Sequence, residues 1–72
     1  SQENQMPVRC FFDMLDNCVA YDSGDNYSGH STGIHAPVSS SLYNIPSTMK
    51  FDSLIGQSAE QLHKYQEGYV AK

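Results

Sequence analysis

Residues 7–21, PVRCFFDMLDNCVAY, contain the densest run of apolar side chains in the chain, and their conformation decides the fold class. Two interpretations compete. A helix would carry an apolar stripe made of Phe11, Met14, Leu15 and Cys18. A hairpin would place strands over 8–15 and 18–22 around a turn at Asp16–Asn17, because Asx residues tolerate the positive φ that such turns need. Most residues of this stretch are indifferent or poor helix formers, which favours the hairpin.

The residues after Pro46 predict two short helices. Ser47 is positioned to cap a helix over 48–55 that stops at Gly56, and Ser58 to cap a second helix with Gln61 at the capping-box position. Apolar residues recur at helical spacing in both segments, namely Phe51, Leu54 and Ile55, then Leu62, Tyr65 and Tyr69.

The segment 24–46 is rich in serine and glycine, and it predicts a long polar loop that ends in an edge strand over 38–45. The expected fold is therefore a single small α+β domain over 1–72. It comprises a polar N-terminal arm (1–6), a hairpin or helix (7–23), the polar loop (24–46) and a helical pair (47–72). The alternative architecture is mostly α, with 7–21 as its first helix.

Length and charge limit the possible functions. A chain of 72 residues forms one domain with a marginal core. The net charge is −4, and a DNA-reading protein needs a basic surface, so we expect no direct nucleic-acid binding. No stretch approaches the roughly 20 apolar residues of a membrane-spanning helix, and no signal peptide opens the chain. We expect no membrane association and a cytoplasmic location.

The cysteines, Cys10 and Cys18, are expected to be reduced and half-buried, because neither a helix nor a tight hairpin brings residues at this spacing together. An alternative is a zinc site made by both thiols with His30 and His35. The histidine spacing suits zinc, but cysteines of zinc sites are usually separated by two to four residues, and here seven lie between them. We therefore expect no metal and no cofactor.

Catalysis is not expected either. A cysteine nucleophile needs a base within hydrogen-bond reach, a group that orients the base, and an oxyanion hole. A chain of this size has little room for the walled pocket that would hold them, and no Walker, dinucleotide, HExxH or nucleophile-elbow motif occurs.

The function that the sequence favours is a non-enzymatic, acidic protein-binding module that modifies or inhibits a larger partner with a basic surface. One form of this hypothesis is a decoy at a nucleic-acid-binding surface. Four aspartates between positions 13 and 25, with no base among them, are predicted to form the contact with three tyrosines. The predicted set is Asp13, Asp16, Asp22, Asp25, Tyr21, Tyr27 and Tyr43.

Two other hypotheses remain open from the sequence. In the first, the chain is a structural accessory subunit, held in extended form within a particle shell or multisubunit complex. In the second, it is a zinc-stabilised mini-domain. The first would be unstructured alone, and the second would need metal to fold.

Overall fold

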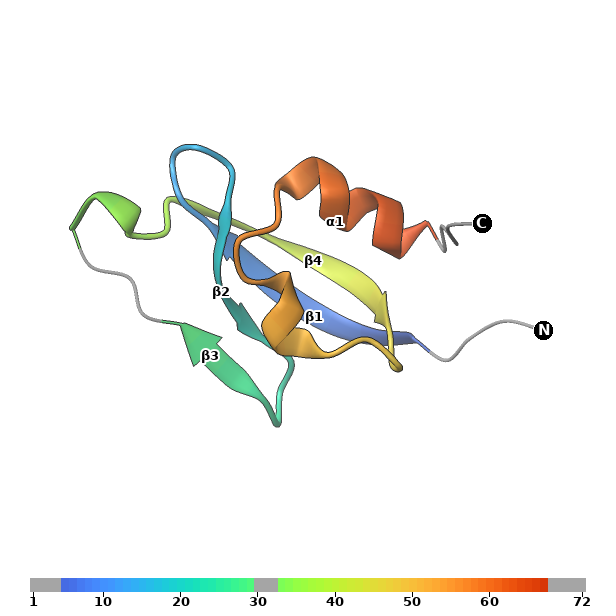
Figure 1. Cartoon of the computed structure of the whole chain (residues 1–72). Coiled ribbons are helices and arrows are strands. Elements are labelled where there is room, and N and C mark those ends of the chain that lie inside the picture. Colours follow the sequence, from blue (N-terminus) through green and yellow to red (C-terminus); the bar gives the residue numbers. More distant parts are fainter. Residues whose placement is uncertain (1–4, 30–32, 68–72) are drawn as a thin grey trace.

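A four-stranded antiparallel sheet dominates the computed structural model, which describes residues 5–29 and 33–67. The spatial order of the strands is β3-β2-β1-β4 (Figure 1). The strands are β1 (Gln5–Phe12), β2 (Cys18–Asp22), β3 (Tyr27–Gly29) and β4 (Ser39–Pro46). The helical elements are η1 (Gly33–His35), η2 (Phe51–Leu54) and α1 (Ala59–Gln66), of which η1 and η2 are 3-10 turns.

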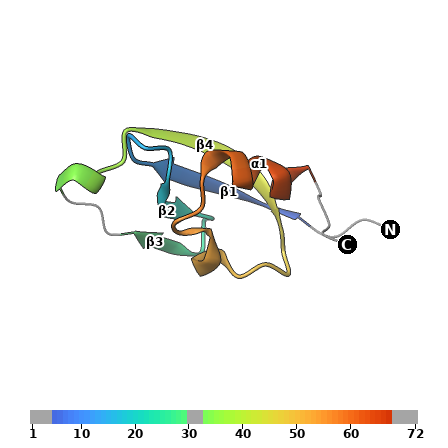
Figure 2. The same cartoon turned by 45° about the horizontal axis from the view of Figure 1, so that its top comes forward.

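The core lies between the sheet and the two C-terminal helical elements. Along β1, alternate side chains are buried, as expected for a strand with one face covered. Figures 1 and 2 show α1 and η2 on the same side of the sheet. Leu54 of η2 and Leu62 of α1 are both fully buried in the core cluster. The strands contribute Val8, Cys10, Phe12, Cys18, Tyr21, Tyr43 and Ile45 to that cluster.

The stretch 7–21 forms the β1–β2 hairpin and not a helix, but its turn is wider than a two-residue turn at Asp16–Asn17. β1 ends at Phe12 and β2 begins at Cys18, so residues 13–17 form the connection. A bulge between Phe11 and Phe12 shifts the register, since Phe11 pairs with Ala20 but Phe12 pairs with Cys18. The bulge leaves Val19 as the extra residue of β2.

The predicted α+β fold class is wrong, and so is the mostly α alternative, because strands dominate the fold. The sequence predicts a polar loop over 24–46 that ends in an edge strand over 38–45. That strand is present as the eight-residue β4, but the loop part also contributes β3 to the sheet. β4 pairs with β1 along its whole length. Serines do not prevent this, because backbone hydrogen bonds make the ladder while Tyr43 and Ile45 supply the buried side chains.

The helical pair is also wrong in its first member. The helix expected over 48–55 is reduced to η2, which is preceded by Lys50 and has no side-chain cap, so Ser47 does not play the expected part. Ile55 is exposed and not on an apolar face of this element.

The second helix lies where the sequence places it. Ser58 is the N-cap of α1, and its hydroxyl oxygen accepts a hydrogen bond from the Gln61 N–H at 3.2 Å. Leu62 is fully buried, and Tyr65 packs against the core. The third residue of the predicted stripe, Tyr69, lies outside the described residues. In the described part of the chain, no helix has the length and apolar character to cross a membrane.

Candidate functional site

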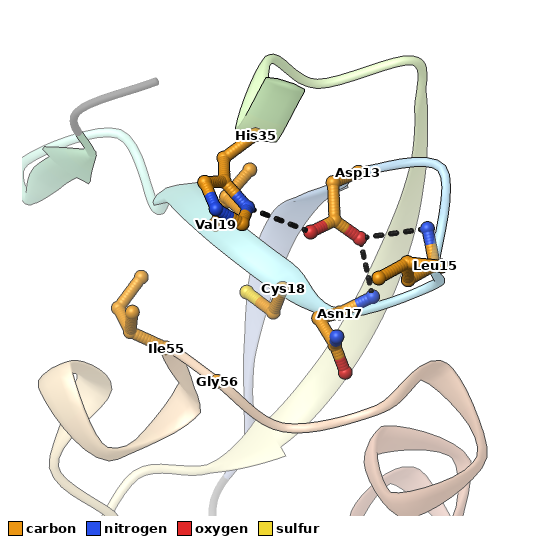
Figure 3. Close-up of a pocket in the computed structure, with 8 residues that line it drawn as sticks. All are labelled: Asp13, Leu15, Asn17, Cys18, Val19, His35, Ile55 and Gly56. Atoms are coloured by element: carbon orange, nitrogen blue, oxygen red, sulfur yellow. Dashed lines mark hydrogen bonds and ion pairs between the residues drawn. The ribbon is translucent and has the colours of Figure 1, made fainter. Parts of the chain in front are cut away.

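The connection between β1 and β2 borders an open hollow of about 440 Å³ (Figure 3). Its apolar lining comes from Leu15 in the connection, Val19 in β2 and Ile55 after η2. Its polar lining comes from Asp13, Asn17 and His35. Residues 13–17 are called the tip loop below.

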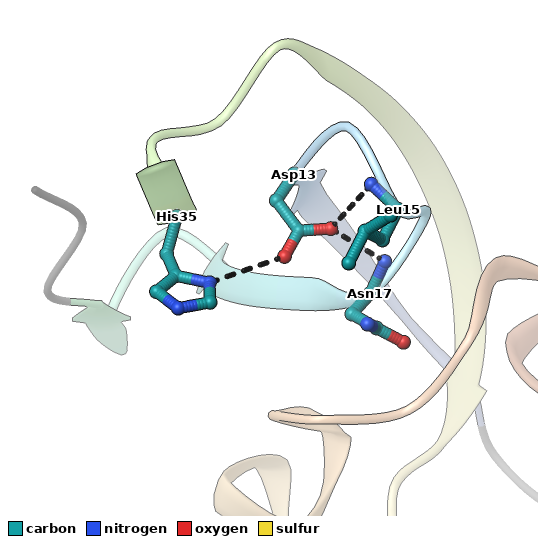
Figure 4. Close-up of polar contacts among 4 residues, drawn as sticks. All are labelled: Asp13, Leu15, Asn17 and His35. Carbon is teal, nitrogen blue, oxygen red and sulfur yellow. Dashed lines mark hydrogen bonds and ion pairs between the residues drawn. The ribbon is translucent and has the colours of Figure 1, made fainter. Parts of the chain in front are cut away.

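The buried Asp13 carboxylate holds the tip loop together through hydrogen bonds, and Asp13 is only 3% exposed. Oδ1 accepts hydrogen bonds from the backbone N–H groups of Leu15 at 2.9 Å and Asn17 at 3.0 Å. Oδ2 lies 3.7 Å from Nδ1 of His35 (Figure 4). These contacts, that with the Asn17 N–H first, hold the pKa of Asp13 below its ordinary value, although desolvation acts in the opposite direction.

The tip loop is also fastened to the chain that leads into α1. The Asp16 carbonyl accepts a hydrogen bond from the Ala59 N–H at 3.1 Å, and Asn17 forms an isolated bridge with Ser58. Asp16 itself has a positive φ of 65°, which Asx residues tolerate better than most. The loop is thus held between the sheet and the helix.

Two large apolar side chains point away from this well-held backbone. Met14 is 74% exposed and Leu15 71% exposed, the highest values among the large hydrophobic residues that the structure describes. Ile55, across the hollow from the loop, is also exposed (Figure 3). Because the backbone is fixed by hydrogen bonds, these side chains are displayed at a defined place.

The two thiols are fully buried and adjacent, which corrects the expectation of separated, half-buried cysteines. Both are free cysteines. The bulged register brings them together on the core face, where the Cys10 thiol is hydrogen-bonded to the Cys18 sulfur. That hydrogen bond, followed by burial, raises the pKa of Cys10. The Cys18 thiol in turn donates to the Ala20 carbonyl at 3.4 Å.

Cys18, His35 and Asp13, which are residue types of a cysteine nucleophile, a base and an orienting acid, all line the hollow. Cys18 is only 1% exposed, so a substrate in the hollow does not reach its sulfur.

The zinc alternative is not supported by the residues that the structure describes. His30 lies outside them, and His35 contacts Asp13. In the described ranges, no three His, Cys, Asp or Glu side chains form a group that could hold a metal ion.

The seven residues predicted to contact a partner do not share one surface. Tyr21 and Tyr43 are buried in the core. The Tyr21 hydroxyl donates to Asp52 Oδ1 at 2.8 Å, and this hydrogen bond raises the pKa of Tyr21. The Tyr43 ring packs edge-on against Phe12.

The exposed members of that set lie at the two ends of β2. Asp16 is in the tip loop. Asp22 is the last residue of β2, and Asp25 follows in the turn that leads to Tyr27. Asp13 is the buried organiser of the tip loop. The acids therefore form no continuous patch.

Sequence reasoning did not single out Met14, Leu15 or Ile55 as surface residues of a site. One available signal was Asp13, because an Asx side chain commonly accepts backbone N–H groups a few residues later in a turn. Nothing in the sequence signals that Leu15 points outward, since the hairpin interpretation continued β1 through it.

Comparisons of the chain with protein-family models, curated proteins and solved structures gave no match.

Proposed function

We propose that the chain is a non-enzymatic protein-binding module that contacts a larger partner through its tip loop. One observation carries the proposal: Met14 and Leu15 are strongly exposed on a loop whose backbone is held by the buried Asp13 carboxylate. Isolated exposed apolar side chains are common on protein surfaces. Two adjacent ones on a backbone fixed from within are what an interface anchor requires.

Pre-organisation supports this function energetically. A flexible loop loses conformational entropy when it binds, and each immobilised side chain costs roughly 0.5–1.5 kcal/mol. Hydrogen bonds from the Leu15 and Asn17 N–H groups to the Asp13 carboxylate already order the backbone of the tip loop from within. Contacts of Asp16 with Ala59 and of Asn17 with Ser58 fasten it to the chain before α1. Most of the energy of apolar burial at Leu15 is then available for binding.

The partner that fits this surface has an apolar pocket for Leu15 and a side chain that enters the hollow between Leu15 and Ile55. Asp16 is exposed beside the anchor, and the chain carries a net charge of −4, so a basic rim around that pocket is favoured. The scattered acids give no particular support to the nucleic-acid decoy form. Two free buried thiols suit a reducing compartment such as the cytoplasm.

The test uses the full chain as bait in an extract of the cells that make it. Leu15→Ser removes the proposed anchor, and Val38→Ser is the matched control, because Val38 is a comparably exposed apolar residue outside the loop and the hollow. We expect a specific partner to be retained by the wild-type chain and by Val38→Ser but to be lost with Leu15→Ser.

Circular dichroism and thermal melts accompany the experiment, and both variants should melt within about 2 °C of the wild type. A partner retained equally by all three baits, or lost with both variants, would overturn the proposal. So would a wild-type bait that retains nothing beyond the bare matrix.

A further inference from the structure

The face of the sheet opposite α1 and η2 is not covered by any element that the structure describes (Figures 1 and 2). Because side chains alternate along a strand, the residues that pair between the buried positions point to this open face. One row crosses all four strands and takes one residue from each: Tyr27, Asp22, Arg9 and Leu42. Tyr27 is 69% exposed and Leu42 57% exposed.

The two charged residues in the middle of this row are neighbours that do not pair with each other. The ion pair between His35 and Asp13 is the only one among the described residues. The Arg9 guanidinium donates to Ser40 Oγ at 3.3 Å, and Asp22 Oδ1 accepts from the Gly24 N–H at 2.9 Å. Both side chains are exposed, and each retains further hydrogen-bonding capacity for a group above the sheet.

A second row on the same face runs through Gly29, Ala20, Phe11 and Ser40. It is less exposed than the first row, since Ala20 is only 4% exposed and Phe11 is half-buried. The side chains of this row are small on β3 and β2, large on β1, and small again on β4. Gly29 and Ala20 lie so close together that a Cβ on Gly29 would overlap the Ala20 Cβ. The β2–β3 side of this row is therefore low, and the Phe11 ring on β1 stands higher.

Both rows are complementary to their own reverse. Consider a two-fold axis that runs parallel to the strands, above the open face and over the gap between β1 and β2. Rotation about it places a second copy face down on the first, with β1 over the partner's β2 and β4 over the partner's β3. Arg9 then lies over the partner's Asp22, and Tyr27 over the partner's Leu42. In the second row, Phe11 lies over the partner's Ala20, which is only 4% exposed, so this contact adds little buried area and the first row carries the interface.

We propose that two copies of the chain associate face to face through this open sheet face, with the two Arg9–Asp22 contacts at the centre. Packed sheets lie about 10 Å apart and rotate by about 30°. Measured in the plane of the sheet, β1 and β2 are each offset from the axis by only about 2.4 Å, half the strand spacing, so this rotation displaces the central charged contacts little.

A second copy explains this face better than an unrelated partner. The chain carries a net charge of −4, yet the crossing row has one base and one acid, and that base is the only one before Lys50. An unrelated basic or acidic partner gains nothing from a neutral row, whereas a reversed copy satisfies both charges. Four strands of this length form a small interface, so the dimer belongs to the weak, concentration-dependent class. The face is separate from the tip loop, so this inference goes beyond the proposed function.

The experiment is a charge exchange followed by sedimentation velocity between about 10 μM and 1 mM protein. Arg9→Asp leaves only acids at the centre of the row, and Asp22→Arg leaves only bases. Each variant alone should dimerise at least about tenfold more weakly than the wild type, because like charges then face each other across the axis. An equimolar mixture should associate again, since each variant supplies the charge that the other lacks.

Melting temperatures of the two variants are measured first, because each also places like charges side by side within one chain. If one variant does not fold, Leu42→Asn replaces it and should weaken the wild-type dimer by removing the contact with the partner's Tyr27. A wild-type chain that stays monomeric at 1 mM would overturn the proposal. A dimer insensitive to the charge changes, or variants that fold but do not associate when mixed, would overturn it as well.

Discussion

The two ends of β2 are both acidic connections between antiparallel strands, but they are built differently. At the tip loop, the Asp13 carboxylate is buried and accepts two backbone N–H groups, and the loop is bonded to the chain before α1. At the other end, Asp22 is exposed and accepts one N–H, that of Gly24. The remaining bonds of this turn are short-range contacts between Ser23 and Asn26.

The comparison shows that aspartate plays two different structural parts in the two turns that flank β2. A buried carboxylate that joins loop, sheet and η1 contributes to the stability of the whole domain. An exposed carboxylate that closes its own turn affects that turn alone, and its charge stays available to other molecules. Substitutions at the two ends should therefore differ in how much they lower the stability and in how far along the chain the effect extends.

The largest effect is expected for Leu62→Ala, because α1 supports the tip-loop end of β2. Leu62 is fully buried, so the substitution should lower the free energy of unfolding by about 2–5 kcal/mol. Denaturant melts measure the loss, and amide hydrogen exchange locates it. Protection should fall first in the residues that contact Gln57 to Ala59. A neutral Leu62→Ala would mean that α1 does not contribute to the core.

The next effect is expected for Asp13→Ala, which leaves the N–H groups of Leu15 and Asn17 without their acceptor. We expect the melting temperature to fall by about 5–10 °C. Asp13→Asn is the control, because an amide oxygen still accepts both hydrogen bonds, and it should recover part of the loss. If Asp13→Ala melted like the wild type, the tip loop would not be held from inside.

Acid pH should act on the tip-loop end through the same carboxylate. The pKa of Asp13 in the folded chain lies below its ordinary value of 3.8, so the stabilisation is present above that value and is lost as the pH falls through the folded pKa. Thermal melts between about pH 2 and 6 should therefore decline below pH 4 more steeply for the wild type than for Asp13→Asn. Identical pH profiles would show that Asp13 does not supply this dependence.

The smallest effect is expected for Asp22→Ala at the other end of β2. The lost hydrogen bond to Gly24 is exposed, so the melting temperature should change by no more than about 2 °C when measured on dilute protein. A decrease as large as that of Asp13→Ala would remove the distinction between the two ends.

Local signals allowed part of the fold to be predicted from the sequence. Ser58 and Gln61 define the start of α1 through contacts within a few residues, and the stretch 7–21 contains a hairpin that its composition favours over a helix. The strand expected over 38–45 is present as β4, at the sheet edge. β3 was missed because its residues, Tyr27–Gly29, carry no apolar alternation and pair only through the backbone.

The candidate site was harder to predict, because it depends on where β1 stops. Continuing β1 to Leu15 assigns Met14 and Leu15 to the sheet, whereas the Asp13 side chain ends the strand by bonding the N–H groups that follow it. The opposite error concerns Tyr21 and Tyr43, which seemed suited to an interface but face the core. Both errors come from tertiary contacts that neighbouring residues in the sequence do not reveal.

The adjacent thiols in the core have a practical consequence for following the motions of the domain. Cys10 and Cys18 are 0% and 1% exposed, so a thiol reagent such as Ellman's reagent reaches them only after the β1–β2 hairpin opens. Under conditions where opening and closing are fast, the labelling rate divided by that of a free thiol gives the equilibrium constant for opening. The native thiols of the wild-type chain thus report on the opening of the centre of the sheet, without an introduced label.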